Sequence, residues 1–318
     1  MKSLLYAEGG DGIGTGHLNR IVNLIENFQI KDDFICCYEN IVQKSFYDDK
    51  NISSISLKEL NNNHFFKYFF IDTKKDRSDL LHVLKGKYQK LVVIDNTTKL
   101  TNNADICITP SYYSKNEEIL IKNTQFRSGY KNLILHPSIN EFHWDPKGYK
   151  LISFGGEDPN NLTLMTLNIL DSINETNNTK VILGPNYKHN RNEIFKFIDE
   201  KDIIKNPKNI YQIFSKSSYV ITALGVTLQE LFKIGVPALL IANFYEDGIE
   251  FEAIEKSAIK YMGRNFINIL GYYKDVNKDI YREMHDRAIS YENNEINIEF
   301  SEIGLNIRNL NQFLNINI

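Results

Sequence analysis

The sequence predicts an α/β protein built from two doubly wound domains, each with a parallel sheet covered by helices. Two observations lead to this class. Short apolar runs of strand length alternate with helical patterns almost from end to end, and the runs fall into two series. Continuous apolar runs are typical of parallel strands buried on both faces. The length of 318 residues also exceeds most single hydrophobic cores and suits two domains.

The first series of expected strands precedes residue 145. Its members are the apolar runs 3–7, 34–38, 68–71, 91–94, 106–108 and 133–135. A helical pattern lies between the first two runs. Its apolar residues are spaced as one face of a helix, namely Leu18, Ile21, Val22, Ile25 and Phe28.

The second series follows a polar, proline-containing stretch at 140–148. Its expected strands are 150–154, 180–183, 219–223 and 238–242. We therefore expect an N-terminal domain over 1–145 and a C-terminal domain over 146–318. A last helical pattern at 303–313 predicts a C-terminal helical segment.

The composition narrows the function classes. Lys and Arg number 37 against 40 Asp and Glu, giving a net charge of -3, so no nucleic-acid partner is expected. The three cysteines form no C-x-x-C pair and no disulfide framework. No N-terminal signal peptide and no apolar stretch of about 20 residues is found, so we expect a cytoplasmic enzyme without a membrane span.

Three strand–loop–helix junctions carry unusual chemistry, and ligands of open α/β sheets bind at such places. The first has five glycines between Gly9 and Gly16, which let the backbone approach a ligand, and then His17 in the first helical turn. The helix dipole there favours the neutral ring that a general base needs. Arg20 would help to hold an anionic group. A glycine-rich turn with a solvated histidine fits the same pattern.

The second junction follows the expected strand at 150–154. Gly155 and Gly156 end that strand, and Asp158 and Pro159 are expected as the N-cap and first residue of a helix. A ligand-facing loop and a structural turn fit equally well. The place of this junction at the start of the second domain also suits an interdomain hinge.

The third junction follows the expected strand at 219–223. Backbone N–H groups of Leu224, Gly225, Val226 and Thr227 would face a phosphate at the start of a short helix. Glu230, one turn into that helix, would accept hydrogen bonds from two ribose hydroxyls. The alternative for Glu230 is a solvated charge on an exposed helix face.

The sequence contains no motif that is typical of a metal or cofactor site. The histidines show no ligand spacing such as H-E-x-x-H, and neither a P-loop nor a G-x-S-x-G elbow is present. We expect no metal and no other cofactor.

Taken together, these junctions resemble a bacterial family that includes the UDP-sugar hydrolase of pseudaminic acid biosynthesis and the spore-coat polysaccharide glycosyltransferases. The resemblance extends to about residue 260. The motifs that carry it are Gly9-Gly10, Ile13-Gly14-x-Gly16-His17-x-x-Arg20, Ser153-Phe154-Gly155-Gly156-x-Asp158-x-x-Asn161-Leu162-Thr163, Leu183-Gly184-Pro185-Asn186, Thr222-Ala223-x-Gly225-x-Thr227-x-x-Glu230-Leu231 and Gly235-Val236-Pro237-Ala238.

The resemblance implies a GT-B architecture, in which two Rossmann-like domains face each other across a cleft. It implies that the C-terminal domain holds a nucleotide sugar, UDP-linked in the first instance, and that the N-terminal domain presents water or an acceptor. His17 would then be the catalytic base in a loop shaped by Gly14 and Gly16. Gly225 and Thr227 would approach the diphosphate and Glu230 the ribose.

Two departures from the family pattern concern the sugar. The hydrolase usually carries Asp where Glu8 stands, and an Asn-Gln pair where this chain has Tyr245 and Glu246. In the family the residues at the latter positions face the sugar, so the donor can differ.

The expected function is a nucleotide-sugar hydrolase acting in nonulosonic-acid or related surface-glycan synthesis, with His17 activating water. The first alternative is a glycosyltransferase with the same donor site and a sugar hydroxyl in place of water. A non-catalytic nucleotide-sugar binding protein is the third reading. The sequence leaves open the sugar, the base, the acceptor and the oligomeric state.

Overall fold

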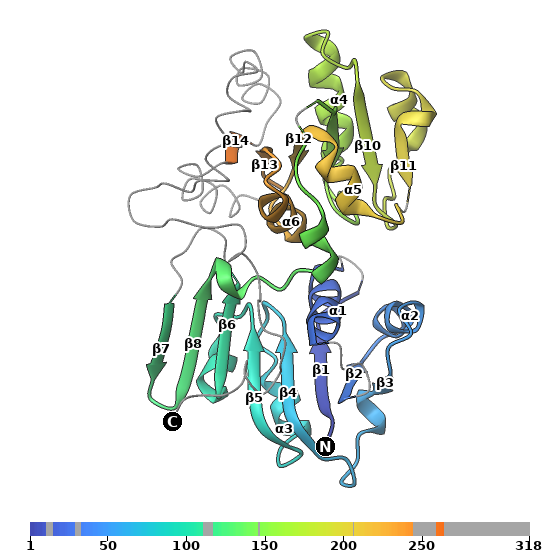
Figure 1. Ribbon diagram of the computed structural model, residues 1–318. Coiled ribbons are helices and arrows are strands. Elements are labelled where there is room, and N and C mark those ends of the chain that lie inside the picture. Colours follow the sequence, from blue (N-terminus) through green and yellow to red (C-terminus); the bar gives the residue numbers. More distant parts are fainter. Residues whose placement is uncertain are drawn as a thin grey trace. The chain divides into compact units, whose positions relative to one another are not determined.

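The computed structural model describes residues 1–10, 15–28, 33–110, 117–145, 147–205, 207–243 and 259–263. These residues form two compact units that divide between Pro137 and Ser138 (Figure 1). The expected boundary at 145 lies a few residues later in the chain. Residues just before it are tied to the second unit, because the Asp145 N–H and the Trp144 indole N–H donate to the carbonyls of Ser215 and Ser217.

The first unit contains an eight-stranded sheet in the order β3-β2-β1-β4-β5-β6-β8-β7 (Figure 1). All neighbouring strands are parallel except β7 and β8, which pair antiparallel. The strands are β1 (Ser3–Ala7), β2 (Phe34–Tyr38), β3 (Ser54–Ser56), β4 (Phe66–Asp72), β5 (Tyr88–Ile94), β6 (Ile106–Pro110), β7 (Glu117–Ile121) and β8 (Thr124–Gly129).

Helices cover this sheet on both faces. They are α1 (Gly16–Phe28), α2 (Ile41–Asp49) and α3 (Ser78–Val83), with 3-10 turns at Leu57–Glu59, Lys99–Asn103 and Tyr130–Asn132. A further 3-10 turn, Pro137–Glu141, spans the division between the two units. Alternate residues of β1 enter two different core clusters, Leu5 with the apolar face of α1 and Leu4 with Leu80 of α3. Successive side chains of a β-strand point to opposite faces of the sheet, so a hydrophobic core forms on each face. The prediction of a sheet covered on both faces is confirmed here.

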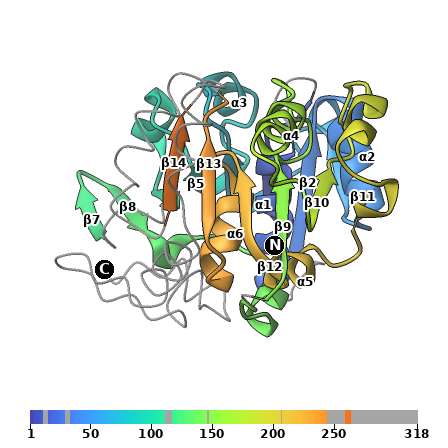
Figure 2. The same cartoon turned by 90° about the horizontal axis from the view of Figure 1, so that it is seen from above.

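The second unit contains a six-stranded parallel sheet in the order β11-β10-β9-β12-β13-β14, which Figure 2 shows from above. Its strands are β9 (Tyr149–Ser153), β10 (Thr179–Leu183), β11 (Ile203–Lys205), β12 (Ser217–Thr222), β13 (Ala238–Ile241) and β14 (Ile259–Gly263). Its helices are α4 (Leu162–Ser172), α5 (Ile210–Ser215) and α6 (Val226–Ile234), with 3-10 turns at Arg191–Lys196 and Glu200–Asp202.

Several expectations about single elements are corrected. The apolar run 133–135 is buried but forms no strand, and β3, β7, β8, β11 and β14 were not expected. The helix expected to start at Asp158 and Pro159 begins later, at Leu162. The helical pattern at 303–313 lies outside the described residues.

Each sheet has a switch point, a pair of neighbouring strands from which the later connections run toward opposite edges of the sheet. In the first sheet it lies between β1 and β4, and in the second between β9 and β12. Such a switch point leaves a crevice at the carboxyl ends of the two strands, because the connections on either side run away from it. Among the helices in the part of the chain described, none is long and apolar enough to cross a membrane.

Candidate functional site

Polar residues gather at the carboxyl ends of three adjacent strands, β1 and β4, which flank the first switch point, and the neighbouring β5. Glu8 follows β1, Asp72 is the last residue of β4, and Asp95 follows β5. Helix α1 begins just after the glycine-rich loop and contributes His17 and Arg20 from its first turns. The fold thus brings three carboxylates, an imidazole and a guanidinium to one edge of the sheet.

His17 is bound to Asp72. Its Nδ1 lies 2.6 Å from Asp72 Oδ1, and the ring is only 14% exposed. Since a carboxylate only accepts, Nδ1 carries the hydrogen of this bond and the lone pair of the neutral ring is on Nε2. The alternative of a solvated histidine therefore does not describe His17.

Arg20 is buried and is shared by two carboxylates. Its Nε donates to Asp72 Oδ2 at 2.7 Å, and one NH2 group donates to Asp72 Oδ1 at 2.8 Å and to Asp95 Oδ2 at 2.7 Å. This NH2 nitrogen also lies 3.0 Å from His17 Nδ1. Both of its hydrogens are already used, so the last distance is a close approach of two donors. The donors that were expected to hold an anionic ligand group are directed at the protein's own carboxylates.

The charges of this cluster stabilise one another. Burial by itself would raise the pKa of Asp72, but Arg20 and His17 hold it below its usual value. Burial by itself would lower the pKa of Arg20, but Asp72 and Asp95 raise it. Asp72 is therefore ionised, and a positive charge formed on His17 would meet a fixed negative partner.

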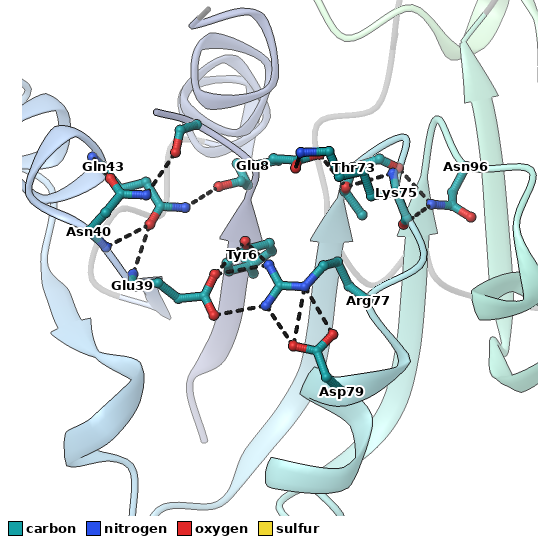
Figure 3. A network of polar contacts seen from close by, with 12 residues as sticks. Tyr6, Glu8, Glu39, Asn40, Gln43, Thr73, Lys75, Arg77, Asp79 and Asn96 are labelled. Atoms are coloured by element: carbon teal, nitrogen blue, oxygen red, sulfur yellow. Dashed lines mark hydrogen bonds and ion pairs between the residues drawn. The ribbon is translucent and has the colours of Figure 1, made fainter. Parts of the chain in front are cut away.

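Glu8 belongs to a second network beside the first (Figure 3). Its carboxylate is buried and accepts from the Thr73 hydroxyl at 2.6 Å, while the Lys75 ammonium pairs with its other oxygen at 2.7 Å. Burial would raise the pKa of Glu8, but Lys75 and Thr73 lower it. The buried Asn96 amide donates to the carbonyls of Thr73 and Lys75 at 2.7 and 2.9 Å and fixes this loop.

A third group of residues supports the ends of β1 and β2 (Figure 3). The Tyr6 hydroxyl and Arg77 both donate to the Glu39 carboxylate, and Arg77 also stacks over the Tyr6 ring. The buried Gln43 side chain donates to the Ala7 carbonyl at 2.7 Å, and Asn40 donates to the Gly9 carbonyl at 2.8 Å. Helix α2 thereby fixes the start of the glycine-rich loop.

The chemistry available at this edge is proton transfer. Nε2 of His17 has no hydrogen-bond partner among the residues that the structure describes. Gly16 begins α1 next to His17, while Gly14 lies outside the described residues. Among the described residues, no group of three His, Cys, Asp or Glu could hold a metal ion.

In the second unit, the loop after β9 packs closely against the loop after β10. Gly155 has φ +76°, and a Cβ on Gly184 would lie 2.3 Å from the Gly155 carbonyl oxygen. The Asn186 N–H donates to the Gly156 carbonyl at 2.9 Å. This close backbone approach explains the glycine at 184, and it holds Gly155 and Gly156 at the switch point.

Asp158 caps helix α4 from outside it. Its carboxylate accepts from the N–H groups of Leu162 and Thr163 at 2.8 and 2.9 Å, although Asn161 is the residue that precedes the helix. Asp158 and Asn161 both have left-handed backbones, with φ of 47° and 52°. Asp158, the expected N-cap residue, therefore does cap the helix with its side chain, but it lies three residues before Asn161, which occupies the N-cap position.

Helix α6 begins on the other side of this switch point. Leu224 and Gly225 lie in the loop, and Val226 and Thr227 form the first turn, where no side chain caps the helix. Its free N–H groups and dipole favour an anion. Tyr245 and Glu246, the expected sugar-facing pair, lie outside the described residues.

Glu230 lies in α6 and is only partly exposed. Its carboxyl accepts from the Tyr211 hydroxyl of α5 at 3.2 Å. Loss of solvation raises the pKa of Glu230 to about 7, against which the bond from Tyr211 acts. This carboxyl group is therefore not the solvated surface charge of the alternative reading.

Sequence reasoning missed the residues that hold His17 and Glu8, namely Asp72, Thr73, Lys75, Asp95 and Asn96. A signal was present for two of them. Asp72 and Asp95 each come directly after an expected strand, and the carboxyl ends of parallel strands meet at one edge of a sheet.

Comparisons with known proteins give distant relatives. No known family profile matches the chain. The uncharacterized protein MJ1062 of Methanocaldococcus jannaschii is 26% identical over 311 residues, covering 86% of this chain and 62% of the relative. The spore coat polysaccharide biosynthesis protein SpsG of Bacillus subtilis is 24% identical over 261 residues, covering 75% of this chain and 76% of the relative. The chain thus spans less than two thirds of the first relative.

Solved structures resemble the whole fold. MurG of Acinetobacter baumannii has a TM-score of 0.59 at 9% identity and covers 91% of this chain and 94% of its own. Anabaena HepE in complex with UDP-glucose has a TM-score of 0.57 at 10% identity, and the match covers 91% of this chain and 93% of HepE. Staphylococcus aureus MnaA in complex with UDP has a TM-score of 0.56 at 13% identity, and the match covers 90% of this chain and 91% of MnaA. At these identities the likeness establishes the fold alone. The predicted GT-B class with two Rossmann-like domains is confirmed.

Proposed function

We propose that this protein displaces a nucleoside diphosphate from a nucleotide-linked sugar, with His17 as the general base. The observation that carries the proposal is the His17–Asp72 bond at the first switch point, which leaves the Nε2 lone pair without a partner among the residues described. An imidazole held in this tautomer by a carboxylate is suited to remove a proton from an attacking oxygen.

The chemical step balances with residues of the first unit. Nε2 of His17 takes the proton of an O–H group while the oxygen attacks the anomeric carbon. The bond from that carbon to the phosphate oxygen breaks, and the nucleoside diphosphate leaves with the electron pair. Asp72 then faces the imidazolium at 2.6 Å and stabilises it.

The second unit is assigned to the nucleotide. The N-terminus of α6 at Gly225–Thr227 would receive the diphosphate and Glu230 the ribose, as the motifs imply. Solved structures of the same fold contain UDP-glucose or UDP. The N-terminus of α6 and His17 each lie at the switch point of their own sheet, and this position supports both assignments because ligands of such folds bind there.

Water is our first choice of attacking group, which makes the protein a nucleotide-sugar hydrolase of surface-glycan synthesis, with UDP-linked amino sugars as the expected substrates. A sugar hydroxyl is the second choice. Two similar proteins support it: the spore coat polysaccharide biosynthesis protein SpsG of Bacillus subtilis, and the spinosyn forosaminyltransferase SpnP, which has the same fold.

One experiment tests the proposal and separates the two choices. The full chain is incubated with UDP-, CDP- and GDP-linked amino sugars, and nucleotide release and sugar products are followed. Release of free sugar without any added acceptor supports hydrolysis. Release only in the presence of a glycan acceptor supports transfer. No release from any donor, with or without acceptor, would contradict both.

A further inference from the structure

Asp95 differs from the other residues around His17 because only part of its carboxylate is used by the protein. Oδ2 accepts from Arg20, but no partner of Oδ1 is found among the residues described. The Asp95 side chain is 24% exposed, whereas the Asp72 side chain is fully buried. Of the two carboxylates bound to Arg20, only Asp95 is open to a ligand.

The backbone at Asp95 is also unusual. Its φ of +55° lies in the left-handed region, which a residue with a Cβ adopts at a cost. Its N–H donates to the Ile108 carbonyl at 2.9 Å and fixes this conformation at the end of β5. The fold therefore holds a partly exposed carboxylate in a strained position next to the catalytic edge of the sheet.

Asp95 is close to His17. The same NH2 nitrogen of Arg20 lies 2.7 Å from Asp95 Oδ2 and 3.0 Å from His17 Nδ1. A molecule that reaches His17 is thus also within reach of the open oxygen of Asp95.

The local charge indicates which group would bind there. Three carboxylates (Glu8, Asp72 and Asp95) and two cations (Arg20 and Lys75) lie around His17, and each of the two cations is already paired with these carboxylates. The open carboxylate oxygen of Asp95 disfavours a phosphate or carboxylate and favours a hydrogen-bond donor.

We propose that Asp95 is a substrate-contacting residue whose Oδ1 accepts a hydrogen bond from a hydroxyl or a protonated amino group of the sugar. The inference rests on the proposed function, since the sugar is the product of hydrolysis or the acceptor in transfer. It adds a specificity-determining residue that selects neutral or amino sugars over acidic ones.

The variant Asp95→Asn provides the test. Asn tolerates the left-handed backbone and keeps an oxygen for Arg20, but it removes the charge that attracts a donor. The control is Asp48→Asn, which makes the same charge change at an exposed residue paired with Lys44 on α2. His17 ring signals in NMR spectra check that the catalytic cluster is unchanged in the variant.

Binding of glucose, glucosamine and N-acetylglucosamine is measured by NMR titration of the full chain. We expect Asp95→Asn to weaken binding of at least one of them about 10-fold or more, while Asp48→Asn has no effect. If the binding of glucosamine is weakened most, the donor to Asp95 is an amino group. If the binding of all three sugars is weakened equally, the donor is a hydroxyl.

Two results would overturn the inference: affinities within twofold of the parent protein for all three sugars, or no saturable binding of any of them to the parent. This test needs no turnover, so it fails or succeeds apart from the proposed function. If the protein releases nucleotide but binds sugars equally well without the Asp95 carboxylate, the proposed function stands and the role of Asp95 is wrong. If sugars bind through Asp95 but no nucleotide is released, Asp95 is a sugar contact and the proposed function is wrong.

Discussion

Asp72 determines which nitrogen of His17, the proposed base, carries the lone pair. It is fully buried and ionised, and it bonds to His17 and twice to Arg20. Burying such charges costs several kcal/mol per ion unless each is paired, and here Asp72 and Asp95 together pair with Arg20. Arg20 therefore keeps Asp72 charged and in place, and through Asp72 it positions His17, the proposed base.

The first prediction concerns Asp72→Asn. The Asn amide can donate to Nδ1 and so favours the tautomer with a hydrogen on Nε2, which removes the base. We expect turnover to fall about 10²–10⁴-fold. Long-range ¹H–¹⁵N NMR spectra should show Nδ1–H in the parent protein and Nε2–H in the variant.

A purely structural role of Asp72 would give a different pattern. The variant would lose stability, but the His17 tautomer and the turnover of the molecules that remain folded would be unchanged. Hydrogen exchange at the core strands of the first unit serves as the folding control, and nucleotide affinity should stay unchanged because the expected nucleotide site lies in the other unit.

The second prediction concerns the pH dependence at Glu230. The pKa of about 7 in the folded protein exceeds the ordinary value of 4.5. The proton is thus held more tightly in the folded state, so this group contributes stability that is full below about pH 4.5 and is lost as the pH rises through 7. A ribose hydroxyl donates to the ionised form. We therefore expect UDP affinity to rise with pH, by up to about tenfold per unit below pH 7.

Calorimetric titration checks this prediction. UDP binding at pH 6 should release protons, seen as a binding enthalpy that depends on the buffer. Glu230→Gln should reduce both the proton release and the pH dependence to the part contributed by the terminal phosphate of UDP, which itself titrates at about pH 6. Equal proton release in the parent protein and the variant would show that Glu230 is not the group that titrates.

At the scale of elements, helix starts hold the candidate sites in place. Asp158 accepts from two N–H groups at the start of α4, and Asn40 with Gln43 forms a capping box on α2. Helix N-termini leave backbone donors without partners, so each cap removes a local cost. The same residues of α2 hold the start of the loop after β1, and the Asp158 cap ties the loop after β9 to α4.

The third prediction is that Asp158→Asn loosens the start of α4. Asn tolerates the left-handed backbone at this position but offers one acceptor oxygen for two N–H groups. We expect a loss of about 1–2 kcal/mol in local stability, seen as roughly 5–30-fold faster hydrogen exchange at Leu162 and Thr163. Asp171→Asn, at an exposed position of the same helix, is the control. Equal exchange in both variants would count against the cap.

At the scale of the whole molecule, the two candidate sites belong to different units. His17 and its carboxylates lie before Pro137, and α6 with Glu230 lies after Ser138. Each unit has its own core clusters, so a substitution in one need not disturb the other.

The fourth prediction is that turnover and nucleotide binding can be lost separately. His17→Ala should reduce turnover by about 10²–10⁴-fold and leave UDP affinity within threefold. Glu230→Ala should weaken UDP affinity about 10–100-fold, since it removes charge-assisted hydrogen bonds. Turnover of His17→Ala within threefold of the parent would remove His17 from the mechanism, and unchanged UDP affinity of Glu230→Ala would remove the nucleotide site from α6.

The sequence by itself determined the class of fold and the strands at its centre. The runs 3–7 and 34–38 match β1 and β2 residue for residue, because central parallel strands are continuously apolar. The antiparallel β7–β8 hairpin and the three-residue strands β3 and β11 were missed. The strands β3 and β11 are too short to show a clear apolar run. In β8 most of the buried side chains are polar (Thr124, Gln125 and Arg127), whereas in β7 the apolar residues Ile119, Leu120 and Ile121 are exposed. The run 133–135 carried the apolar signal without being a strand, because burial alone does not specify strand pairing.

Only the tertiary structure decided what surrounds the expected base. His17 was recognisable from the glycine-rich loop before it, since that signal is local in the chain. Asp72 and Asp95 lie 55 and 75 residues from their partners His17 and Arg20. The order of strands in the sheet brings them together, and no local pattern encodes that order. The role of Arg20 changed for the same reason: its charge was visible in the sequence, but its two buried partners exist only in the folded sheet.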